Sequence, residues 1–174
     1  MDADTIMALD WVETNTPPQA TLAVLPTGLM INYLSRRTNP SRYPNWPPPE
    51  IAAFGQEKMT DDFIRNSPDY IIVIGTDLGG FGEKYFGMET RFGGDLMKWV
   101  NAHYEQKCLI GSDWVQTGRF GIKILQKTRR QEALPGGAGQ GRGFDLNMLD
   151  TSTTFMDTKS MLSFGERRRA FCNC

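Results

Sequence analysis

The chain has 174 residues, of which 40% are hydrophobic and 22% charged. This composition is typical of a globular protein with one core, and it excludes disordered and fibrous classes. The 19 Lys and Arg residues are balanced by 20 Asp and Glu residues, giving a net charge of -1. Nucleic-acid binders usually carry a basic excess, so we expect no nucleic-acid partner.

Neither an export signal nor a membrane span is expected in this sequence. The N-terminus, Met1-Asp2-Ala3-Asp4, is acidic where a secretory signal is basic. The one long uncharged stretch, residues 14–35, is interrupted by Pro17, Pro18 and Pro26, which exclude a continuous apolar helix. We therefore expect this chain alone to be soluble, with no signal peptide or transmembrane helix.

The first part of the chain predicts a helix, a strand and a second helix. Apolar residues recur at three-residue steps within residues 4–13, as in a short amphipathic helix. Residues 21–25 form a compact apolar run closed by a proline, which favours a buried strand. Thr27 is expected to cap a helix over residues 28–37, in which three side chains share one face (Met30, Tyr33 and Leu34).

A proline-rich segment separates these elements from the next strand. Residues 39–49 contain five of the ten prolines, so we expect a stiff loop there. Pro49 is suited to begin a short helix over residues 50–54, and Thr60 to open a further helical turn. Residues 70–74 are β-branched and aromatic, and they give the strongest strand prediction in the chain.

The remaining elements follow a Gly-rich loop at residues 76–87. A helix is predicted over residues 92–106, and two antiparallel edge strands over residues 107–111 and 119–126. The fold class is therefore α/β: a small open sheet with a parallel βαβ core and an antiparallel C-terminal edge pair, flanked by helices. Residues 1–127 are expected to form this domain, and residues 128–174 a Gly-rich linker and a poorly packed tail.

The proline loop and the helix before it supply the candidate binding residues. Arginine provides forked donors for phosphate or carboxylate, and aromatic rings provide flat faces for a sugar. The alternative is a rigid loop whose aromatic residues cover the sheet edge. The residues predicted to bind substrate are Asn32, Arg36, Arg37, Arg42, Tyr43, Trp46 and Glu50.

Other chemistry-bearing residues give weaker patterns. Asp77 and Glu83 follow the strongest strand, where open α/β sheets often place ligands, but solvated loop charge is the favoured explanation for them. The spacing of the nearby glycines does not match a dinucleotide fingerprint. His103 is the only histidine and lies on the apolar face of a predicted helix, so packing is favoured over catalysis. Cys108 is expected in the core.

No cofactor or metal site is predicted. The remaining two cysteines, Cys172 and Cys174, match no disulfide framework or usual zinc pattern, so their redox state stays open. No catalytic residue is assigned from the residues alone.

A series of landmarks along residues 11–127 resembles a known family. In order they are Asn15-Thr16-Pro17-Pro18, Leu25-Pro26-Thr27-Gly28, Asn32-Tyr33-Leu34-Ser35-Arg36-Arg37-Thr38-Asn39-Pro40, Pro48-Pro49-Glu50, Ser67-Pro68-Asp69-Tyr70-Ile71-Ile72-Val73, Tyr85-Phe86-Gly87, Trp99-Val100-Asn101-Ala102-His103-Tyr104 and Arg119-Phe120-Gly121-Ile122-Lys123-Ile124-Leu125. The series resembles the soluble C-terminal, extracytoplasmic region of bacterial multi-spanning glycosyltransferases of the dolichyl-phosphate-mannose protein mannosyltransferase type.

The resemblance implies an accessory domain on the extracytoplasmic face of the membrane. Its partners would be a membrane-embedded glycosyltransferase half, which this chain lacks, and a polyprenyl-phosphate sugar or glycan acceptor. The domain would assist acceptor or head-group binding rather than catalyse transfer. Two alternatives stay open: a stand-alone α/β enzyme with a carboxylate site near Asp77 and Glu83, and a non-catalytic structural or interaction domain.

Overall fold

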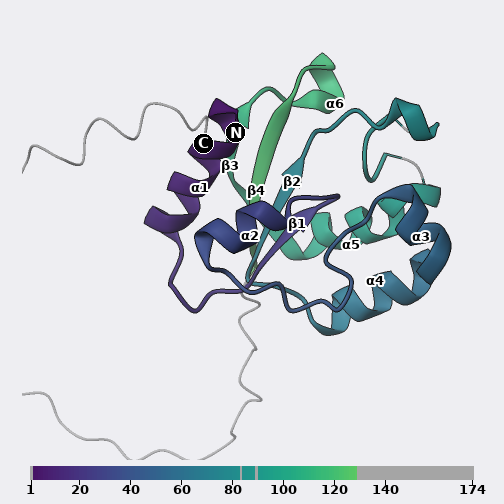
Figure 1. Ribbon diagram of the computed structural model, residues 1–174, viewed down its shortest axis with the longest axis horizontal. Coiled ribbons are helices and arrows are strands. Elements are labelled where there is room, and N and C mark those ends of the chain that lie inside the picture. The colour runs from purple at the N-terminus through teal and green to yellow at the C-terminus, as the bar shows by residue number, and fades with distance from the viewer. Residues whose placement is uncertain (1, 83, 89, 129–174) are drawn as a thin grey trace, which may run out of the picture. The chain divides into compact units, whose positions relative to one another are not determined.

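Figure 1 shows the computed structural model, which describes residues 2–82, 84–88 and 90–128. Four strands form one sheet in the order β1-β2-β4-β3. Their bounds are β1 Leu22–Leu25, β2 Tyr70–Ile74, β3 Tyr104–Gly111 and β4 Gly121–Lys127. β1 and β2 are parallel, and β4 is antiparallel to both β2 and β3. The predicted α/β fold, with its parallel core and antiparallel C-terminal pair, is confirmed.

The helices of the described residues surround this sheet. They are α1 (Ala3–Asn15), α2 (Leu29–Ser35), α3 (Pro48–Phe54), α4 (Gln56–Arg65), α5 (Asp95–His103) and α6 (Trp114–Thr117), with shorter helical turns at Gly79–Phe81 and Thr90–Gly94. None of the helices in these residues is long and apolar enough to cross a membrane.

Helices cover both faces of the sheet, as a parallel strand pair requires. α1 and α2 lie on one side, and α3, α4 and α5 on the other (Figure 1). A hydrophobic core lies on each face of the sheet, and the side chains of β1 alternate between them. Leu22 and Val24 pack in the core beneath α1 and α2, whereas Ala23 and Leu25 pack in the aromatic core on the opposite face. Burial on both faces explains why β1 is apolar throughout rather than alternating.

The helix predicted over residues 92–106 is shorter than expected at both ends. Phe92 has non-helical dihedral angles, and α5 ends at His103. Tyr104 begins β3, where it pairs with Lys127 and its hydroxyl donates to the Pro68 carbonyl at 2.6 Å. Pairing with β4, a contact distant in sequence, therefore ends the helix.

Two predicted helix starts are wrong. Thr60 lies inside α4, which begins at Gln56 directly after Gly55. The φ of Gly55 is 84°, which favours glycine, and this residue separates α3 from α4. Gly28, not Thr27, precedes α2, and no side chain caps that helix.

The predicted linker and tail lie outside the described residues after Thr128.

Candidate functional site

The proline loop is hydrogen-bonded to the chain just after β1. The Trp46 backbone N–H donates to the Pro26 carbonyl at 2.7 Å. The Trp46 ring is fully buried and packs edge-to-face against Phe63 and Phe86. This ring therefore belongs to the core and offers no face to a sugar, which favours the edge-covering interpretation of the loop.

Arg42 serves as an anchor for this loop. The Arg42 Nε lies 3.1 Å from the buried carboxylate of Asp62 on α4. The same carboxylate accepts from Ser41 Oγ at 2.9 Å, from the Arg42 backbone N–H at 3.0 Å and from Asn66 Nδ2 at 3.1 Å. Asp62 thus holds the loop against α4, and sequence reasoning did not single this residue out.

Asn32 and Arg37 join α2 to its neighbours. Asn32 Nδ2 donates to the carbonyls of Leu22 and Arg37, at 2.7 and 3.1 Å. The Arg37 guanidinium donates to the Ser35 carbonyl and to both the hydroxyl and the carbonyl of Thr16, which follows α1. These donors stabilise the fold, so neither side chain is available as predicted for an external ligand.

Tyr43 and Glu50 complete the predicted set. The half-buried Tyr43 ring packs on Phe54, with ring centroids 5.3 Å apart. Glu50 is half-buried in the first turn of α3, where a carboxylate favours the helix dipole. The seven predicted residues therefore do not converge on one site.

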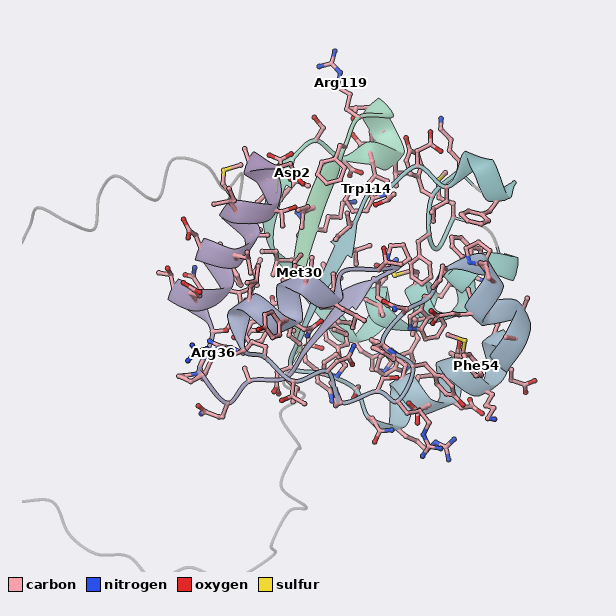
Figure 2. The ribbon with its side chains drawn as sticks, viewed as in Figure 1. Asp2, Met30, Arg36, Phe54, Trp114 and Arg119 are labelled. Atoms are coloured by element: carbon pink, nitrogen blue, oxygen red, sulfur yellow. The ribbon has the colours of Figure 1, made fainter. Side chains whose placement is uncertain are left out.

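Arg36 differs from the other arginines of this segment. Among the described residues, its guanidinium has no hydrogen bond or ion pair, and the residue is exposed. Figure 2 places it at the end of α2, on the rim of the domain. Its φ is 53°, a left-handed conformation in which helices usually end with glycine. An arginine at this position carries a conformational cost that glycine would not.

The helix that ends at Arg36 exposes most of its apolar side chains. Only Ile31 and Ser35 of α2 are buried, whereas Met30 is 59% and Tyr33 78% exposed. Leu29 and Leu34 are also exposed. Successive residues turn by about 100° around a helix axis, so these four side chains form one stripe opposite the core. We call Leu29, Met30, Tyr33 and Leu34 the α2 stripe.

The stripe contradicts the usual pattern of a surface helix, whose outer face is polar. The sequence signal for it is the composition of α2 itself. This helix has no charged residue, and its apolar residues cover more than half of its circumference. A helix packed on one side of a sheet cannot bury all of them. Helical spacing places Met30, Tyr33 and Leu34 on one face but does not indicate whether that face is buried or exposed.

The described residues do not form the alternative carboxylate site expected near Asp77 and Glu83. Asp77 is exposed, and its Oδ1 accepts from the Gly79 backbone N–H at 2.8 Å, which explains it as a turn residue. Glu83 lies outside the described residues. Within those residues, no group of three or more His, Cys, Asp or Glu side chains is placed to hold a metal ion. Trp46 and Trp114 are both buried, so neither ring contributes to an exposed apolar surface for a partner.

Two remaining ring residues, His103 and Tyr104, lie at the end of α5 and the start of β3. His103 stacks on Trp99 at 4.4 Å and its Nδ1 lies 2.7 Å from the Trp99 carbonyl, which confirms the predicted packing role. Burial raises the pKa of the Tyr104 phenol. Neither residue faces the α2 stripe, since Trp99 and Tyr104 pack with the core on the opposite side of the sheet.

The described geometry therefore leaves Arg36 and the α2 stripe as the candidate site. No family profile matches this sequence, and no curated protein and no solved structure is significantly similar to it.

Proposed function

We propose that this chain is a non-catalytic accessory domain of a membrane glycosyltransferase that uses polyprenyl-phosphate sugars. In this role Arg36 helps to bind the negatively charged head group of the donor. The observation that carries the proposal is the guanidinium of Arg36, which is exposed and has no partner among the described residues, on a left-handed backbone at the end of α2.

The chemistry of the surrounding segment supports a phosphate ligand. Between Glu13 and Glu50 the sequence contains three arginines and neither lysine nor an acidic residue. Two of the arginines, Arg37 and Arg42, are engaged with protein groups, so Arg36 is the one available to bind the head group. A guanidinium presents paired N–H donors that match two phosphate oxygens. The landmark series that resembles these glycosyltransferases is the reason to name this class of phosphate.

The test is direct binding of a short-chain, water-soluble polyprenyl-phosphate sugar to the chain, without lipid vesicles. Arg36→Gly removes the charge and relieves the left-handed strain, so the variant is expected to remain folded. We expect its affinity to fall by at least about tenfold, as for a lost charge-assisted contact.

Arg119→Ser is the matched control, because Arg119 is also exposed and lies beside β4, away from α2 (Figure 2). Its affinity should stay within about twofold of the unmodified chain. Equal binding by the Arg36→Gly variant contradicts the proposed role of Arg36. A chain that binds no polyprenyl-phosphate sugar at all contradicts the proposed function.

A further inference from the structure

We infer that the α2 stripe docks on the surface of a lipid bilayer, with its apolar side chains at the boundary between head groups and acyl chains. The inference rests on the proposed function in one respect: attachment to a membrane-embedded partner would keep this domain near the bilayer.

The residue types on the stripe suit that boundary. Met30, Leu29 and Leu34 are apolar, and Tyr33 combines an apolar ring with a hydroxyl, a combination enriched at membrane interfaces. Within the described residues, no hydrogen bond engages the Tyr33 hydroxyl, and the ring is 78% exposed. Arg36 follows at the helix end, where a cation meets lipid phosphates.

The shape and size of the stripe favour lipid over a protein surface. The four side chains lie on the outside of a single short helix, so they form a ridge. The stripe exposes on the order of 400 Å², a usual size for the largest apolar patch of a monomer. A standard protein interface buries about 800 Å² on each partner. A ridge of this size enters a fluid lipid layer without a complementary groove.

The electrostatic share of this docking is expected to be small. Arg36 is the cation nearest the stripe in sequence, whereas the neighbouring α1 carries Asp4, Asp10 and Glu13 and no basic residue. One arginine near an anionic surface changes affinity by about fivefold. The apolar side chains must therefore supply most of the binding, which salt should weaken little.

The test is sedimentation of the full chain with vesicles of phosphatidylcholine, alone or mixed with phosphatidylglycerol, in the absence of any sugar lipid. The unmodified chain is expected to partition into both. Replacing Met30→Ser and Tyr33→Ser together should lower the partition coefficient by at least about tenfold, because two large apolar groups leave the interface. Arg36→Gly should remove only the preference for the anionic mixture.

Val115→Ser is the control. Val115 is 53% exposed on α6, close to the 59% of Met30, but α6 lies at another end of the domain (Figure 1). Its partitioning should stay within about twofold of the unmodified chain. Circular dichroism confirms that each variant is folded.

Three results overturn the docking inference: no partitioning by the unmodified chain, unchanged partitioning by the double variant, or an equal loss in Val115→Ser. If the chain does not partition into vesicles, but its cross-linking to a membrane protein requires Met30 and Tyr33, the stripe binds a protein partner instead. Because the sugar-lipid assay contains no bilayer and this assay no sugar lipid, failure of one inference is distinguishable from failure of the other.

Discussion

Replacing Asp62 should release the proline loop from α4. The Asp62 side chain is only 7% exposed, and its carboxylate accepts hydrogen bonds from Ser41 Oγ, the Arg42 backbone N–H and Asn66 Nδ2. Asp62→Ala leaves these donors without their acceptor. The loop carries Trp46, so loosening it also weakens the aromatic core beneath.

The expected loss in the free energy of unfolding is about 3 kcal/mol. Single hydrogen bonds to a charged group contribute ~1.5–3 kcal/mol, but donors at the rim regain some hydration when the acceptor is removed. The ion pair adds little, because the Arg42 side chain is 74% exposed and solvent screens it. Exposed pairs of this kind contribute about 0–1 kcal/mol, so Arg42→Ala should cost no more than that.

Urea unfolding followed by tryptophan fluorescence measures the difference. With a slope of about 1.5 kcal/mol per molar urea, Asp62→Ala should lower the midpoint by about 2 M. Arg42→Ala keeps the backbone donor and is the matched control. The reasoning is refuted if Asp62→Ala costs less than about 1 kcal/mol, or if Arg42→Ala costs as much as Asp62→Ala.

Three further substitutions test other contacts. A Cβ at Gly75 would lie 2.4 Å from the Trp114 indole, so Gly75→Ala should lower the stability measured in a thermal melt by about 1–3 kcal/mol. Gly80 has open space around it, so Gly80→Ala is the control and should leave the melt unchanged. Similar melts for the two variants would contradict the packing at Gly75. Burial raises the Tyr104 pKa, so the folded state holds the phenol proton more tightly, and its contribution is complete below the unfolded pKa of about 10 and lost as pH rises through the folded value. Above about pH 10, the free energy of unfolding in urea should decline less steeply with pH for Tyr104→Phe than for the unmodified chain. An identical slope would refute this assignment. Arg37→Met should cost about 2 kcal/mol of stability by removing the contacts between α2 and the end of α1, and an unchanged melt would show that these donors do not stabilise the fold.

The sequence predicted the strands better than the helix ends. Residues 22–25 and 70–74 are short, apolar and bounded by prolines or glycine, and this pattern has few alternatives. The end of α5 had no such boundary, since residues 104–106 fit a helix and become a strand only through pairing with β4. The sequence places the start of α4 too late, because Thr60-Asp61-Asp62 resembles an N-terminal capping sequence although it lies inside the helix.

The candidate site was less predictable for a related reason. Sequence identifies donors and rings, but not which of them the folded chain uses internally. Arg42 finds its partner Asp62 twenty residues away on α4, and Arg37 reaches back to Thr16. Of these three arginines, Arg36 alone has no such partner among the described residues, and it lies one residue beyond the helix, in the left-handed turn.

The chain beside β1 also limits strand addition at this edge of the sheet. β1 is at the edge of the sheet, and three backbone groups at this edge or just after it have partners: the Leu22 N–H donates to the Thr38 carbonyl, the Leu22 carbonyl accepts from Asn32 Nδ2, and the Pro26 carbonyl accepts from the Trp46 N–H. An unoccupied edge invites strand addition and fibrillar association. The contacts from Thr38, Asn32 and Trp46 therefore leave fewer backbone groups of this edge available for strand addition, which disfavours association through β1.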